Sequence, residues 1–169
     1  MTQTQHEQLR AFADHYAYDT SYMEFMLEAA PDAFAAFAAA QGMSEHRQAL
    51  PVDDHHVAHV ATMQGEDCGP CAQLNLRMAV EAGVDRGLLQ CLLDDPSGLP
   101  SHLRDVRDHA TAVASGGDVD QERVARLRAH YGDTAFAELA LSIAGCSLYP
   151  TLKRALGYGQ HCEALTLDF

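Results

Sequence analysis

The segment from Gly65 to Val80 reads GEDCGPCAQLNLRMAV, and it places two cysteines, Cys68 and Cys71, at the expected start of an apolar helix. The first turn of a helix has unpaired N–H groups and a partial positive charge, both of which favour a thiolate over a thiol. Position alone therefore indicates a partly activated sulfur nucleophile. The same pair also fits two other interpretations, a pair of metal ligands or two ordinary buried thiols.

The sequence on both sides of this segment predicts an all-α protein. Apolar residues recur at helical spacing along the chain, and no stretch has the period-two alternation of a strand. Clusters of Gly, Pro, Asp and Ser mark the ends of the apolar segments. We expect a loop over 42–50 and helices over 7–18, 22–30, 32–40, 53–64, 69–82, 86–93, 101–115, 120–131 and 134–154.

Composition indicates one soluble globular domain over residues 1–169, with about 1–50 as an N-terminal helical extension. The formal net charge of -13 disfavours nucleic acid and anionic membranes as partners. No basic and apolar leader starts the chain, and no stretch approaches the roughly 20 apolar residues that cross a bilayer. We therefore expect a cytoplasmic protein, in which a disulfide is usually transient and catalytic. Five cysteines, an odd number, also argue against a structural disulfide framework.

The helix expected over 53–64 carries three histidines, His55, His56 and His59, just before the cysteine pair. A helical hairpin would fold this helix back beside the cysteines, where a histidine can donate the proton that a leaving group needs. Helical spacing puts His55 and His59 on one stripe and His56 on a neighbouring, more apolar stripe. His56 is therefore the histidine expected to face the core.

The same residues support an alternative function without catalysis. His55-x3-His59 followed by Cys68-x2-Cys71 has the spacing of zinc ligands, which predicts a helical protein with a structural zinc site at these four residues. A further pair of ligand types, His161-Cys162, has no companion motif.

The neighbours of the cysteines also affect the chemistry. Asn75 lies about 40° from Cys71 around the helix, at about 100° per residue, so it should be buried beside the pair and needs a hydrogen-bond partner. Glu66 and Asp67 carry negative charge next to Cys68 and disfavour its thiolate.

The two cysteines outside these motifs, Cys91 and Cys146, are set among leucines and small residues. We expect both to lie in the core.

The cysteine pair and the helix that ends Glu81-Ala82-Gly83-Val84 resemble the alkylhydroperoxidase D-like and carboxymuconolactone decarboxylase family. The resemblance covers the chain from about Pro51 onward. It implies an all-α multi-helical bundle with a CxxC motif at the N-terminus of a buried helix, assembled into homo-oligomers. It also implies peroxide reduction by the pair, with electrons from a dithiol donor such as a lipoylated protein. The tetrapeptide is similar to the thioredoxin active site too, but that fold requires strands, which this sequence does not predict.

Carried over position by position, the resemblance matches Cys68 and Cys71 and departs at three other positions. The family's glutamate about twelve residues before the first cysteine is His56, its histidine before the second cysteine is Pro70, and its histidine after the pair is Asn75. The usual proton relay is therefore absent. We hypothesise that His56 serves at the relay position and that Asn75 orients it.

The sequence thus predicts a thiol-dependent peroxide or disulfide reductase, an antioxidant oxidoreductase of peroxiredoxin type. Cys68 and Cys71 form its redox-active disulfide, and His56 and Asn75 complete the catalytic site. Helix position favours Cys68 as the nucleophile and the resemblance favours the second cysteine, so the choice stays open. No cofactor or metal is expected for this function, and the partners are a small peroxide or disulfide and the dithiol donor. A decarboxylase-like enzyme that does not use its cysteines is a third interpretation.

Overall fold

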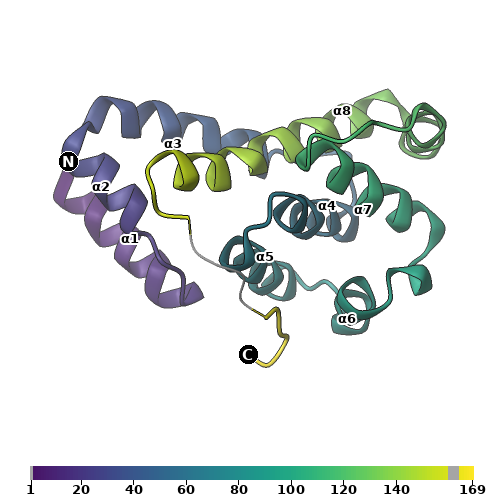
Figure 1. Cartoon of the computed structure of the whole chain (residues 1–169), viewed down its shortest axis with the longest axis horizontal. Coiled ribbons are helices and arrows are strands. Elements are labelled where there is room, and N and C mark those ends of the chain that lie inside the picture. Colours follow the sequence, from purple (N-terminus) through teal and green to yellow (C-terminus); the bar gives the residue numbers. More distant parts are fainter. Residues whose placement is uncertain (1, 160–163) are drawn as a thin grey trace.

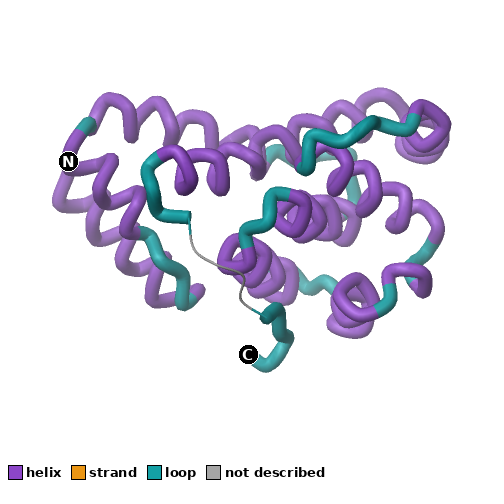
Figure 2. The backbone as a smooth tube through the Cα atoms, in the orientation of Figure 1, coloured by secondary structure: helices purple, strands orange, loops and turns teal. Residues whose placement is uncertain are grey.

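The protein is all-helical over the residues that the structure, a computed structural model, describes, namely 2–159 and 164–169 (Figure 1, Figure 2). The predicted all-α class is confirmed, and no strand occurs within those ranges. The elements in chain order are α1 (Thr2–Tyr16), α2 (Ser21–Ala29), α3 (Pro31–Glu45), α4 (Val52–Gly65), α5 (Gly69–Glu81), α6 (Arg86–Asp94), the 3₁₀ turn η1 (Pro96–Gly98), α7 (Ser101–Ala114) and α8 (Gln121–Ala155).

Capping residues place several helix starts close to their predicted positions. Pro31 occupies the first turn of α3, where its missing N–H leaves no hydrogen bond unmade. Asp85 caps α6 by accepting a 3.0 Å hydrogen bond from the backbone N–H of Leu88. Asp120 caps α8 in the same way through a 2.9 Å bond from the N–H of Glu122.

Gly132 divides α8 into two helices. Its φ of 74° and ψ of 171° are non-helical and lie in a region that favours glycine. The sequence predicted separate helices over 120–131 and 134–154, and the break at Gly132 confirms that division.

The segment 42–50 differs from its prediction because α3 continues to Glu45. Ser44 is buried, and its hydroxyl donates a 2.9 Å hydrogen bond to the carbonyl oxygen of Gln41 within the last turn. Packing of this turn against α8 extends the helix past Gly42, whose low helix propensity favours an earlier end.

Helix α4 lies at the centre of the fold and packs against α5, α7 and α8 (Figure 1). Every residue over 54–63 is buried, the polar ones included. The main hydrophobic cluster gathers around Val57 and Val60 of this helix, with Leu76, Leu103 and Ile143 from its neighbours. The polar side chains of α4 must therefore find their hydrogen-bond partners inside the protein.

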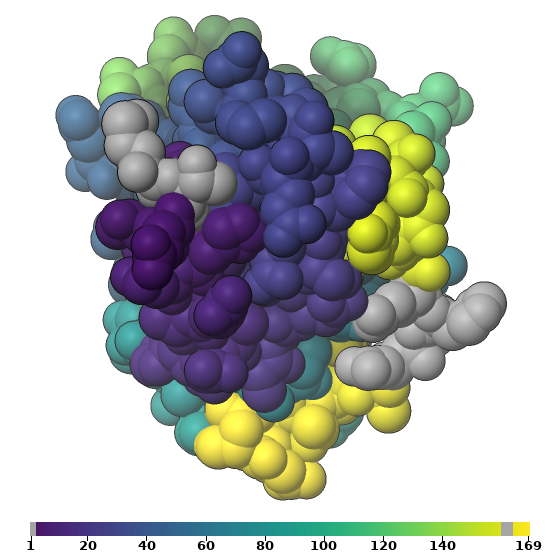
Figure 3. Space-filling model, turned by 90° about the vertical axis from the view of Figure 1, so that its left-hand side faces the viewer, coloured from purple at the N-terminus to yellow at the C-terminus, as the bar shows by residue number. Residues whose placement is uncertain are grey.

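Helices α1, α2 and α3 form a layer with an apolar cluster of its own. Tyr22, Met23, Leu27 and Phe34 are buried there, and Phe37 packs against them. Helix α2 contacts α1 and α3, and α3 runs along α8. These N-terminal helices cover most of the face turned toward the viewer in Figure 3.

Helices α3 and α8 meet backbone to backbone at Gly145. A Cβ at this position would overlap the backbone nitrogen of Ser44 and lie 2.7 Å from the carbonyl carbon of Met43. We expect Gly145→Ala to lower the free energy of unfolding by about 1–3 kcal/mol, because the backbone of α3 must shift. Chemical denaturation measures this difference.

Gly42→Ala is the matched control, because a Cβ at Gly42 meets nothing within 4 Å. Because alanine has a higher helix propensity than glycine, Gly42→Ala should raise the free energy of unfolding by up to about 1 kcal/mol. Equal stability of Gly145→Ala and the unsubstituted protein would contradict the close approach of the two helices.

One helix of the described part, α8, is long and apolar enough to cross a membrane by length and composition, which the sequence did not predict. Of its most apolar window, 44% is buried inside the protein. The core helix of a soluble protein meets the same criterion, so the helix is a weak indication of a membrane span. Leu139, Ile143 and Cys146 of α8 pack in the interior.

Candidate functional site

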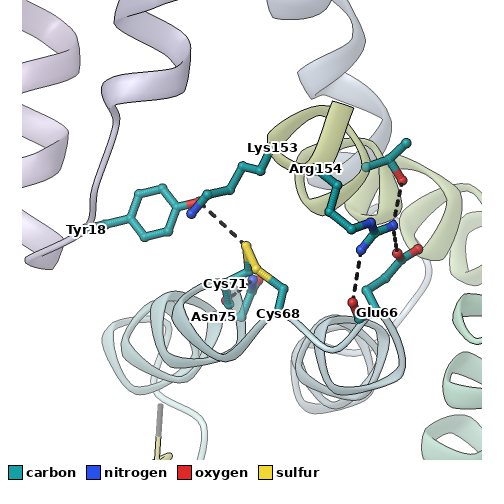
Figure 4. The surroundings of a disulfide bond; sticks show 8 residues. Tyr18, Glu66, Cys68, Cys71, Asn75, Lys153 and Arg154 are labelled. Carbon is teal, nitrogen blue, oxygen red and sulfur yellow. Dashed lines mark hydrogen bonds and ion pairs between the residues drawn. A yellow bond between two sulfur atoms is a disulfide. The ribbon is translucent and has the colours of Figure 1, made fainter. Parts of the chain in front are cut away.

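Cys68 and Cys71 form a disulfide at the N-terminus of α5, with their Cα atoms 5.3 Å apart. Cys68 is the N-cap residue and Cys71 lies in the first turn, as the sequence predicted. Cys71 is 2% exposed, whereas Cys68 is half-buried. Figure 4 shows side chains from the α1–α2 loop and from α8 gathered around the pair. The two sulfurs therefore have different surroundings.

A tight turn places α4 beside the cysteine helix. Asp67 has a φ of 54°, in the left-handed region that aspartate tolerates better than most residues. The backbone N–H of Cys68 then donates a 3.0 Å hydrogen bond to the carbonyl oxygen of Met63 and closes the end of α4. The predicted helical hairpin is thus formed.

Arg154 of α8 lies against the acidic residue before the pair. Its guanidinium donates a 2.6 Å hydrogen bond to the carboxylate of Glu66 and a 3.0 Å bond to the backbone oxygen of the same residue (Figure 4). The sequence predicted that Glu66 disfavours a thiolate at Cys68. The ion pair with Arg154 offsets part of that effect.

His59 has hydrogen-bond partners at both ring nitrogens. Its Nδ1 lies 3.2 Å from Oδ1 of Asn75, and its Nε2 lies 2.7 Å from the hydroxyl of Ser142. The same hydroxyl lies 3.3 Å from Nδ1 of His55. Asn75 in turn donates a 2.8 Å hydrogen bond to the carbonyl oxygen of Cys71. This network joins the histidine helix to the cysteine helix and to α8.

The hypothesis that Asn75 orients His56 is wrong in the identity of the histidine, because Asn75 bonds to His59. The hairpin turns at Asp67, and His59 and Asn75 lie equally far from it along the chain, so they face each other across the hairpin. His56 lies about one helical turn further from Asp67 than His59 does. It is 9% exposed, and its Nδ1 has no hydrogen-bond partner within the described residues.

Burial lowers the pKa of all three histidines. The pKa values of His55 and His56 fall to about 4, mainly through desolvation, with repulsion from His56 acting on His55 and from Arg47 on both. The pKa of His59 falls well below its usual value, also mainly by desolvation. All three rings are therefore neutral at pH 7 and bring hydrogen bonds but no positive charge to the site.

A cavity of about 160 Å³ reaches Cys71 from the side of the N-terminal layer. The three histidines of α4 line it together with Asn75, and Phe12, Tyr22 and Met23 supply much of the apolar wall. Its volume is below the roughly 300–1,000 Å³ of typical ligand pockets. The cavity therefore suits a small molecule.

Tyr18, which contacts the pair, and Lys153, which contacts Tyr18, were not predicted. The hydroxyl of Tyr18 lies 3.6 Å from Sγ of Cys71, and Nζ of Lys153 donates a 3.5 Å hydrogen bond to that hydroxyl (Figure 4). A sequence signal for Lys153 exists, because it follows Cys146 and Pro150 at helical spacing on an otherwise apolar face. No local pattern marks Tyr18.

The remaining cysteines have different environments. Cys146 is buried beside Met63 and Cys71, which confirms its predicted core position, and burial raises the pKa of its thiol. Cys91 is only partly buried at the edge of the main cluster, with its sulfur 3.2 Å from the carbonyl oxygen of Asp95. Its prediction as a core residue is therefore wrong in part.

The four-ligand zinc site is not formed. Within the described ranges, no three His, Cys, Asp or Glu side chains come together as a group that could hold a metal ion. The rings of His55 and His59 do lie close together, with centroids 4.0 Å apart and planes tilted by 46°. However, hydrogen bonds occupy both ring nitrogens of His59, and the cysteines are joined to each other. His161 and Cys162 lie outside the described residues.

Comparison of the chain with known protein families and with curated proteins finds no match. Over the described residues, the fold and site define an all-helical protein with a cysteine pair at disulfide distance, of which Cys71 lines a small cavity.

Proposed function

We propose that the protein is a thiol-dependent peroxide reductase of the alkylhydroperoxidase D-like type, with Cys68 and Cys71 as its redox pair. The observation that carries the proposal is that Cys71 lines a cavity of about 160 Å³. A space of this size admits a hydroperoxide or another small molecule but not a folded protein that carries a disulfide. The pair is also at disulfide distance, as the oxidised half of such a cycle requires.

The oxidative half of the proposed cycle begins at Cys71, because Cys71 and not Cys68 borders the cavity. Its thiolate attacks the terminal oxygen of the hydroperoxide, so that an S–O bond forms and the O–O bond breaks. The alkoxide leaves as the alcohol with the proton that the Cys71 thiol lost on ionisation. Cys68 then attacks the sulfenic acid of Cys71, which forms the disulfide and releases water. Two thiols have lost two electrons, and the peroxide has gained them.

The reductive half uses Cys68, the more exposed sulfur of the pair. The thiolate of a dithiol donor, such as a lipoyl group, attacks Sγ of Cys68, and the electron pair of the broken S–S bond leaves on Cys71. The second thiol of the donor then attacks the mixed disulfide and frees Cys68. The peroxide would thus react at Cys71 and the dithiol donor at Cys68.

His56 and Asn75 act differently from each other in this proposal. His56 lines the cavity, so its ring is placed to hold the hydroperoxide by a hydrogen bond. Asn75 acts through His59 and through the backbone of Cys71, which fixes the start of α5.

The test of this function is a redox titration followed by mass spectrometry with peptide mapping. We expect the protein to lose two hydrogens reversibly at Cys68 and Cys71, and dihydrolipoamide to restore them. Cys68→Ser and Cys71→Ser should each lack this change. Failure of the unsubstituted protein to form a reversible disulfide, or to consume a small hydroperoxide with a dithiol present, would overturn the proposal.

A further inference from the structure

The proposed chemistry needs a thiolate at Cys71, and the histidines around it supply no charge. A thiolate in a buried place is unstable unless a cation or a hydrogen-bond donor lies close. Cys71 is 2% exposed, so water does little to stabilise it. The start of α5 favours the thiolate. Because His55, His56 and His59 are neutral at pH 7, any charged side chain that adds to this effect must be a different one.

Lys153 is a buried side chain that extends toward the pair (Figure 4). It is the only lysine of the chain, and it is 2% exposed. Its Nζ lies 4.9 Å from the ring centroid of Tyr18 and 5.4 Å from that of Tyr22. Each such contact with an ammonium stabilises it by roughly 0.5–2 kcal/mol, against several kcal/mol for burying the charge. A lysine buried between two tyrosine rings beside a reactive pair indicates a role.

Tyr18 connects this lysine to the sulfur. Ala17 has a φ of 46°, uncommon for alanine, and the N–H of Tyr18 bonds to the carbonyl oxygen of Ala13 at 3.0 Å. The chain therefore turns sharply after α1, and the buried ring of Tyr18 points at the cysteines (Figure 4). Burial raises the pKa of Tyr18 to about 12, so the hydroxyl keeps its proton at pH 7 and can donate it in a hydrogen bond.

We infer that Tyr18 donates a hydrogen bond to the thiolate of Cys71 and that Lys153 acts through Tyr18 as the positively charged positioning residue. The contacts of 3.5 Å and 3.6 Å that form this chain join α8, the α1–α2 loop and α5. This inference rests on the proposed function and gives it a thiolate-stabilising pair in place of the relay that the sequence lacks.

Tyr18 and Lys153 act at the step where negative charge appears on Cys71. When a dithiol thiolate attacks Cys68, a new S–S bond forms to the donor, the Cys68–Cys71 bond breaks, and its electron pair leaves on Sγ of Cys71. The Tyr18 O–H and the Lys153 ammonium stabilise that negative charge, and no proton is transferred. The same stabilisation keeps a larger fraction of Cys71 ionised for its attack on a peroxide.

The other titratable groups around Cys71 do not supply this charge. Burial raises the pKa of Tyr22, Cys146 and Tyr149, so these side chains keep their protons at pH 7. Two carboxylates act in the opposite sense: Asp19 beside Tyr18, and Glu45, which is exposed at the edge of the cavity.

The inference is tested on the reduced protein in a Cys68→Ser background, which leaves Cys71 without its disulfide partner. Alkylation by iodoacetamide against pH, with peptide mass mapping, gives the thiol pKa of Cys71. We expect Lys153→Met to raise that pKa by at least about one unit and to slow alkylation at pH 7 about tenfold. Tyr18→Phe should slow it several-fold, and Lys153→Arg should restore most of the rate.

Tyr16→Phe is the matched control, because its hydroxyl bonds to Glu81 at 2.5 Å, away from the pair, and it should leave the thiol pKa unchanged. Thermal unfolding shows whether each variant is folded, and Lys153→Met keeps most of the side-chain volume. An unchanged thiol pKa in folded Lys153→Met and Tyr18→Phe would overturn the inference. Because this readout involves no peroxide, the inference can fail while the redox cycle of the pair stands, and the reverse also holds.

Discussion

Replacing Cys71 with serine should abolish peroxide consumption, whereas replacing Cys68 should stop the cycle after a single turnover. Cys71 borders the cavity and its sulfur would make the first bond to oxygen, so its loss should lower the rate by at least roughly three orders of magnitude. In Cys68→Ser, the sulfenic acid formed at Cys71 has no resolving thiol beside it. A single-turnover reaction with one equivalent of a small alkyl hydroperoxide measures both effects, and dimedone marks the sulfenic acid.

Cys91→Ser is the control for loss of a thiol, since Cys91 lies at the edge of the main cluster and does not border the cavity. It should consume peroxide at the unsubstituted rate. A dimedone adduct on Cys68, with a burst retained in Cys71→Ser, would reverse the assignment of the two cysteines.

Most of the fold could be predicted because its signals are local. The division at Gly132 and the start of α6 after Asp85 depend on residues within one turn of the boundary, and both boundaries were predicted close to their true positions. The end of α3 was not predicted, because Ser44 is held in the helix by α8, which lies about one hundred residues further along the chain. Tertiary packing decides such a boundary, and local propensity does not contain it.

The site was predictable only where it lies within the α4–α5 hairpin. The spacing of Cys68 and Cys71 placed both at the start of α5, and the hairpin placed the histidines beside them. Tyr18 and Lys153 are separated by 135 residues and meet only because the N-terminal layer folds over the pair. No periodicity within one segment encodes that contact.

The N-terminal layer therefore does more than extend the domain. It supplies Tyr18 and part of the apolar wall of the cavity, while α8 supplies Lys153, Ser142 and Arg154. The cysteine motif fixes which sulfurs can react. The segments far from it in sequence fix the charge and the solvent access of those sulfurs, and so decide its chemistry.

Acid should destabilise the protein strongly between pH 6.5 and pH 4, because its buried histidines are neutral. The pKa values of His55 and His56 are about 4 in the folded protein, below the usual value of 6.5 that applies to the unfolded chain. In this window the unfolded chain binds protons that the folded one does not, so stability is full above pH 6.5 and is lost as the pH falls. At pH 5 each of these two histidines should cost about 2 kcal/mol, a large share of the 5–15 kcal/mol that is typical of a whole domain. His59, whose pKa is also lowered, adds to the loss.

Urea denaturation at pH 7, 6 and 5 measures this loss, and the range above pH 5 keeps the titration of carboxylates small. His56→Gln removes one titrating ring and should flatten the dependence by the share of one histidine, about 2 kcal/mol between pH 7 and pH 5. His15→Gln, at an exposed position on α1, is the matched control and leaves the buried cluster intact. If His56→Gln followed the same pH dependence as the unsubstituted protein, His56 would not be held neutral by burial. The cavity that Cys71 lines would then hold an ionisable histidine, and the need for Lys153 as its source of positive charge would disappear.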